Sequence, residues 1–179
     1  PQTGKSEPRR LAVITPEELA DRIASRQAFI LAELARVLEM QRQSRQQVGA
    51  LEIRRNEIGR LDQLDLDHLR GAELNQRQVH RTLSSRSEGV PMHILGLLAD
   101  LSNNKVDSPD VQRRMQGLLD EIDRLDREHL PTINRELTAA IKSAQNRLQA
   151  PPSNSSDTVA PVLASAGKHQ DEVIASLEQ

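Results

Sequence analysis

Two segments of this chain repeat the same spacing of an aspartate and a histidine. Residues 61–69 and 122–130 are identical at five of nine positions. Each copy contains Asp-x-x-His, once as Asp65 with His68 and once as Asp126 with His129. Residues three apart on a helix share a face, and carboxylate–imidazole pairs of this kind hold metal ions inside helical bundles. One interpretation is therefore a metal site built from both copies.

The other interpretation is that Leu-Asp-x-Leu-Asp is the ordinary pattern of an acidic amphipathic helix. A metal bundle also requires glutamates that enter from other helices at matching depth. The sequence does not place such residues, so we assign no metal ligand and expect no cofactor.

A third histidine, His80, has the position of a phosphate-accepting residue on a signalling bundle. In that context a carboxylate usually follows the histidine, with a proline a few residues later. Here Arg81 follows, and the next proline is Pro91. An exposed, solvated histidine is the simpler interpretation. His93 and His169 have no chemical cluster near them in the sequence.

The same stretch forms a small basic patch, made of Arg77, His80, Arg81 and Arg86. Such a patch could meet an acidic partner or an anionic lipid. The default interpretation is a solvated helix face, because charged side chains on helices usually point into water.

Several classes of chemistry lack the residues that they need. The chain has no cysteine, no Gly-x-Ser-x-Gly motif and no glycine-rich phosphate loop. We therefore expect no enzyme and assign no catalytic residue. The net charge is −2 and the one aromatic residue is Phe29, which argues against a nucleic-acid binder. The longest apolar run is a few residues, too short to span a bilayer.

Long helices must position these residues, and proline shows where they begin. Thr15 followed by Pro16 predicts a helix start, and Glu18 completes a capping box. The helix should run over about 16–58, on a seam with alternating three- and four-residue steps that are typical of a coiled coil. The seam residues are Ala20, Ile23, Gln27, Ile30, Leu34, Val37, Gln41, Ser44, Val48, Leu51, Arg55 and Ile58. The polar members Gln27, Gln41, Ser44 and Arg55 are expected to form polar layers in the packed seam.

Two more arms follow. A turn ends at Asp65, which we expect to cap a helix over about 66–101 with a break near 89–91. Ser108 and Pro109 predict the start of a third arm over 108–149, kinked at Pro131. Residues 1–12 are expected to form a flexible arm, 150–161 a linker, and 162–179 a C-terminal helix that is truncated.

These elements predict an all-α fold over 13–149. Short connections make neighbouring helices antiparallel. We therefore expect an elongated antiparallel three-helix bundle or coiled coil, with a loosely attached C-terminal helix.

Three segments also resemble helical regions of large membrane-anchored bacterial envelope proteins of uncharacterised function. They are 15–22 (TPEELADR), 72–79 (AELNQRQV) and 107–115 (DSPDVQRRM). The resemblance covers most of 13–149 and supplies no catalytic residues. It implies a stalk or coiled-coil region of a larger protein, which allows a location outside the cytoplasm.

The sequence thus predicts a non-enzymatic structural scaffold or protein-interaction module, a fragment of a larger protein. Its partner would be another protein, or a second copy bound through helix faces. We expect no nucleic acid and no membrane span within this segment. Two alternatives remain open, namely a signal-relaying bundle of a membrane receptor and a metal-binding bundle.

Overall fold

A computed structural model describes residues 15–149 and 158–179 of the chain. Those residues form helices and no strands, so the fold is all-α. The expected arm at 1–12 and most of the expected linker lie outside the described residues. The helices are α1 (Pro16–Ile58), α2 (Gln63–Ser84), α3 (Val90–Asn103), α4 (Pro109–Glu128), α5 (Leu130–Gln149) and α6 (Val159–Leu177).

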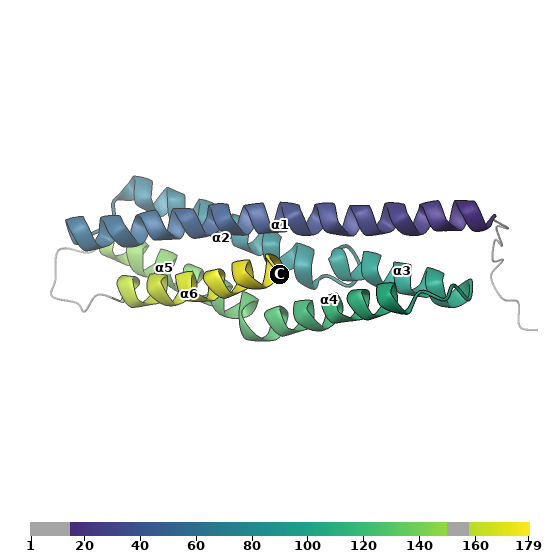
Figure 1. The fold of residues 1–179 in the computed structure, drawn as a ribbon. Coiled ribbons are helices and arrows are strands. Elements are labelled where there is room, and N and C mark those ends of the chain that lie inside the picture. The colour runs from purple at the N-terminus through teal and green to yellow at the C-terminus, as the bar shows by residue number, and fades with distance from the viewer. Residues whose placement is uncertain (1–14, 150–157) are drawn as a thin grey trace, which may run out of the picture.

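The molecule is elongated, and α1 runs along its whole length (Figure 1). Helices α2 and α3 follow one another back along α1, and α4 and α5 then return in the original direction. Helix α6 turns back beside α5 and α1 and ends near the middle. One half of the molecule therefore contains α1, α2, α5 and α6, whereas α1, α3 and α4 form the other half. This arrangement is compatible with three antiparallel arms.

Helix α1 begins and ends where the sequence predicts. The Glu18 backbone N–H donates to Thr15 Oγ1 over 3.2 Å, and the Thr15 N–H donates to Glu18 Oε2 over 2.8 Å. This capping box satisfies donors that have no partner inside the helix. Gly59 ends the helix with φ +77°, a left-handed conformation that glycine adopts without strain.

Helix α2 begins three residues earlier than expected, and the prediction that Asp65 caps it is wrong. Asp62 is the cap: its Oδ1 accepts from the Asp65 N–H over 2.9 Å. Asp65 returns a bond to the Asp62 N–H over 2.9 Å. Asp65 is therefore the third helical residue of a capping box, which brings its carboxylate to the α1–α2 interface.

The expected interruption of the second arm lies at 85–89, between α2 and α3. Gly89 is buried there, and a Cβ atom on it would lie 2.4 Å from the Thr82 carbonyl oxygen. Only glycine therefore allows the chain to fold this closely over the end of α2. Pro91 follows in the first turn of α3, where it needs no N–H.

The third arm is broken at His129, two residues before the predicted kink at Pro131. Pro131 lies in the first turn of α5. Proline suits this position, because the helix needs no N–H there and the φ angle of proline is already close to the helical value. Upstream, Pro109 opens α4 as expected, but the Ser108 side chain makes no capping hydrogen bond in the described structure.

The core is a narrow aliphatic seam. The predicted α1 seam is confirmed at Ile30, Val37, Gln41, Ser44, Val48 and Leu51, which are all buried. The predictions for Ala20 and Ile58 are wrong, since both residues are exposed, Ile58 by 56% at the end of the bundle. Helix α6 is packed more closely than expected, because Leu163, Ala166 and Val173 are fully buried. It begins at Val159, inside the segment expected to be a linker.

No helix within 15–149 or 158–179 is both long and apolar enough to cross a membrane.

Candidate functional site

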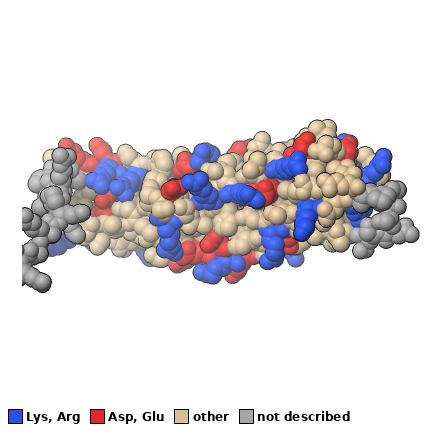
Figure 2. Space-filling model, turned by 180° about the vertical axis from the view of Figure 1, so that it is seen from behind, with Lys and Arg blue, Asp and Glu red and all other residues tan. Residues whose placement is uncertain are grey.

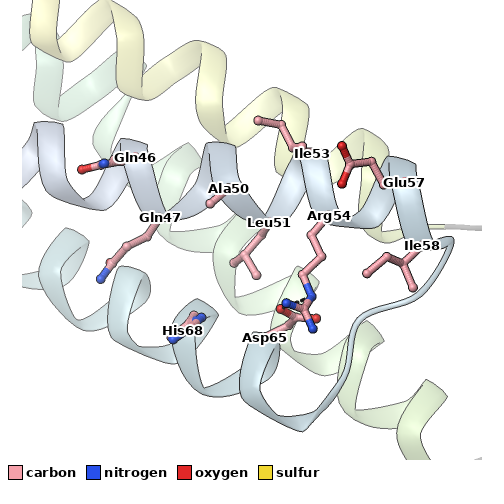
Figure 3. A pocket seen from close by; sticks show the side chains of 10 residues that line it. All are labelled: Gln46, Gln47, Ala50, Leu51, Ile53, Arg54, Glu57, Ile58, Asp65 and His68. Atoms are coloured by element: carbon pink, nitrogen blue, oxygen red, sulfur yellow. Dashed lines mark ion pairs between the residues drawn. The ribbon is translucent and has the colours of Figure 1, made fainter.

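A groove lies between the C-terminal half of α1 and the first turns of α2. Its volume is about 670 Å³. Figure 3 shows the residues that line it, which come from both helices. They are Gln46, Gln47, Ala50, Leu51, Ile53, Arg54, Glu57, Ile58, Asp65 and His68.

The groove leaves large apolar side chains in contact with water. Ile53 is 61% exposed and Ile58 is 56% exposed, although Leu51 beside them is buried. Leu64, at the start of α2, is also 57% exposed. The packing of α1 against α2 therefore does not cover the apolar surface at this end of the molecule.

An ion pair lies in the middle of the groove (Figure 3). Arg54 Nε lies 3.0 Å from Asp65 Oδ1, and Arg54 Nη2 donates to Asp62 Oδ2 over 2.6 Å. The Asp65 N–H, and to a smaller extent Arg54, hold the pKa of the Asp62 carboxyl below its usual value. Asp62 and Asp65 are thus engaged in capping and pairing.

The structure separates the two Asp-x-x-His copies. Asp65 and His68 both line the groove, but Asp65 is buried and His68 is exposed. Asp126 and His129 lie at the joint of α4 and α5 and turn to different neighbours. Across 15–149 and 158–179, no group of three or more His, Asp, Glu or Cys residues gathers as metal ligands would.

Asp126 accepts two hydrogen bonds from α2. Its Oδ1 lies 2.9 Å from His80 Nε2 and 2.5 Å from Ser84 Oγ. Asn134 Nδ2 lies 2.6 Å from the other His80 nitrogen. The Ser84 hydroxyl therefore donates to a carboxylate and not to an imidazole, so the three side chains do not have the serine–histidine–aspartate order of a catalytic triad.

The basic patch is neutralised by carboxylates. Arg77 pairs with Glu73, Arg81 pairs with Glu88, and Arg86 Nη2 lies 2.9 Å from Asp123 Oδ2. Asp123 comes from α4, so the sequence around the patch did not reveal it. Figure 2 shows basic and acidic side chains interspersed over the face seen there. The solvated, paired helix face is the interpretation that the contacts favour.

His129 and His169 form a contact that the sequence did not predict. Their Nδ1 atoms lie 2.9 Å apart, although the residues are 40 positions apart in the chain. Arg124 Nη1 lies 3.2 Å from the other nitrogen of His129. Burial lowers the pKa of His129, and His169 and Arg124 lower it further. Arg124 in turn lowers the pKa of Glu121.

A fully buried polar layer crosses the half of the molecule that contains α6. Gln41 Nε2 donates to Gln76 Oε1 over 3.0 Å, and Gln170 Nε2 donates to the same oxygen over 3.1 Å. Gln170 also donates to Ser44 Oγ, which donates to the Ala72 carbonyl oxygen. Within the described residues, Gln41 Oε1, Gln76 Nε2 and Gln170 Oε1 have no hydrogen-bond partner. The predicted polar positions Gln41 and Ser44 are thus members of a layer that joins α1, α2 and α6.

No protein-family model matches this chain, and comparisons with curated proteins and with solved structures also give no match. The resemblance to bacterial envelope proteins therefore stays a prediction, and the function has to be argued from the groove and the buried layer.

Proposed function

We propose that this chain is a non-enzymatic helical scaffold, and that the groove between α1 and α2 is where it binds another helix. The observation that carries the proposal is the exposure of Ile53 and Ile58, at 61% and 56%, beside a concave surface. Apolar side chains gathered in a groove between two helices favour an amphipathic helix, which would cover them with its own apolar face.

The engagement of the titratable groups supports a structural role. Asp65 is paired with Arg54, and Asp126 accepts from His80 and Ser84. Asp65 lines the groove, and His80 and Ser84 line a second pocket, but protein partners already hold all three side chains. A general acid, a general base or a nucleophile would have to leave such a partner to meet a substrate. The groove also presents Glu57 and His68 beside its aliphatic carbon.

We propose that the first occupant to test is a second copy of the chain. Sedimentation equilibrium at rising protein concentration measures its self-association. Ile53→Arg should raise the dimer dissociation constant about tenfold or more, because a cation placed against apolar carbon costs over about 1.4 kcal/mol.

Leu31→Arg is the matched control, since Leu31 is 62% exposed on the same helix but does not line the groove. This variant should associate like the unmodified chain. A monomer at every concentration, or equal weakening by both substitutions, would count against association through the groove.

A second candidate is a signal-relaying bundle, and the buried glutamine layer favours it. Three amide atoms without partners make the packing around Gln41, Gln76 and Gln170 less favourable than an apolar seam. A seam weakened in this way can exchange between two packings. The relay requires membrane-spanning helices and an output domain in the parent protein, so the flanking reading frame tests it.

A further inference from the structure

The joint between α4 and α5 is held to α6 by the two histidines. His129 is the residue between these helices, with φ −120° and ψ −54°, and it ends α4. His169 lies in the middle of α6, and the two ring centroids are 5.2 Å apart. The His129 side chain is only 12% exposed. The contact therefore connects a break in the third arm to α6, the helix that the sequence predicts to be loosely attached.

The geometry allows one arrangement of protons. Two Nδ1 atoms 2.9 Å apart can form a hydrogen bond only if one carries a proton and the other does not. Arg124 can only donate, so the His129 Nε2 atom beside it must accept. His129 then carries its proton on Nδ1 and donates to His169 Nδ1, and His169 carries its own proton on Nε2. Both imidazoles are neutral in this arrangement.

A second proton on either ring disrupts the arrangement. On His129 it would occupy Nε2 and face the N–H of Arg124. On His169 it would occupy Nδ1 and face the N–H of His129. A metal ion between the two Nδ1 atoms meets the same obstacle, because His129 would then have to carry its proton on Nε2, toward Arg124.

The charges around the pair come from α4 and α6. On α4, Arg124 lies between Glu121 and Glu128, and its Nη2 donates to Ser176 on α6 over 2.9 Å. On α6, Glu172 favours the charged form of His129, as Glu128 does. These carboxylates do not outweigh burial, His169 and Arg124, so the pKa of His129 is lowered.

The other sides of α6 make contacts that protonation of the histidines leaves in place. On α5, Glu136 accepts from Ser165 over 2.7 Å. On α1, Arg45 and Arg42 pair with Asp171 and Glu178 over 2.8 and 2.7 Å. The first half of α6 also buries Leu163 and Ala166 completely. A loss of the histidine contact should therefore weaken the hold on α6 from His169 onward, while these contacts leave the fold intact.

We propose that the His129–His169 contact is a pH-sensitive latch, which holds α6 to the α4–α5 joint while both rings are neutral and releases it when they gain a proton. The latch would work whether or not another helix occupies the α1–α2 groove.

Hydrogen exchange on the full chain, corrected for intrinsic rates at each pH, tests the release. Protection of amides in 169–177 should fall about threefold or more from pH 7.5 to pH 5.5, whereas amides in α3 keep theirs. The double variant His129→Gln/His169→Gln should lose this pH dependence. His93→Gln, a change of a histidine on α3, should retain it.

A second measurement uses the unmodified chain, so it stands even if the double variant does not fold. Side-chain ¹⁵N NMR at pH 7.5 should find the proton of His129 on Nδ1 and that of His169 on Nε2. Protons on Nε2 of both rings would overturn the latch. So would an unchanged fall in protection in the double variant, or constant protection in the unmodified chain. Protection of 169–177 raised by Zn²⁺ at pH 7.5, and only when both histidines are present, would show a metal site instead.

Discussion

Arg54 on α1 lies against Asp65 on α2, with Nε and Oδ1 atoms 3.0 Å apart, and the Asp65 side chain is 2% exposed. Arg54→Met keeps most of the apolar stem but leaves this buried carboxylate without its cation. We expect a loss of about 1–3 kcal/mol in the free energy of unfolding, because Asp65 keeps only its bond from the Asp62 N–H. Urea denaturation measures the loss.

Arg70→Met is the matched control for this pair. Arg70 Nη1 lies 3.1 Å from Asp67 Oδ1 on the same helix, but the two side chains are 45% and 55% exposed. Exposed pairs contribute little, so the change should be within about 0.5 kcal/mol. Equal effects of the two substitutions would show that burial of Asp65 does not make its pairing important.

Gly89 should tolerate no side chain. A Cβ atom there would lie 2.4 Å from the Thr82 carbonyl oxygen and 2.7 Å from that of Ser85, and backbone atoms cannot rotate away. We expect Gly89→Ala to destabilise the chain by about 1–3 kcal/mol. Gly71→Ala, in the middle of α2 with nothing within 4 Å of the added atom, should instead stabilise it by up to about 1 kcal/mol. Thermal unfolding of both variants checks the opposite signs.

Leucine substitutions in the glutamine layer should change the free energy of unfolding by amounts that do not add. Gln76→Leu removes the oxygen that accepts from both Gln41 and Gln170, so the buried Gln41 amide loses its partner and the Gln170 amide keeps only Ser44 Oγ. We expect a loss of about 1–3 kcal/mol. Replacing all three glutamines by leucine removes donors and acceptors together, which should recover that stability or exceed it. A triple variant that is less stable than Gln76→Leu would contradict this account of the layer.

Stability should fall in two steps as the solution is acidified. The folded-state pKa of His129 is lowered from 6.5, so the unfolded chain binds more protons and stability falls once the pH drops below about 6.5. Arg124 lowers the pKa of Glu121 from 4.5. The ionised Glu121 carboxylate therefore stabilises the folded state above about pH 4.5, and this stabilisation is lost as the pH falls further. Urea denaturation at several pH values should lose the upper step in His129→Gln/His169→Gln. Glu121→Gln should diminish the lower step alone.

Local signals predicted most of the helix positions. The capping box of Thr15 and Glu18, together with the seam through Val37 and Leu51, predicted α1 to its terminal residues, because both are properties of neighbouring turns. The second cap was misplaced because Asp62 and Asp65 are both good capping residues. The capping box of Asp62 and Asp65 shows why Asp65 lies inside the helix, and the ion pair with Arg54 then holds its carboxylate at the α1–α2 interface.

Contacts between distant helices could not be predicted in the same way. His169 had no neighbour in the sequence that suggested chemistry, and its partner His129 becomes visible only when α6 folds back along α5. The close packing of α6 was missed for the same reason, since Gln170 interrupts its apolar pattern but joins the layer of Gln41 and Gln76. The sequence could have indicated the exposure of Ile53, because Ile53 is a large apolar residue outside the predicted seam.

Hydroxyl-radical footprinting at rising protein concentration tests whether a second helix covers the groove between α1 and α2. We expect oxidation of Ile53 and Ile58 to fall as the chain associates, whereas oxidation of Leu31 should stay constant. Unchanged oxidation of Ile53 and Ile58 in the associated state, or protection of Leu31 alone, would contradict it.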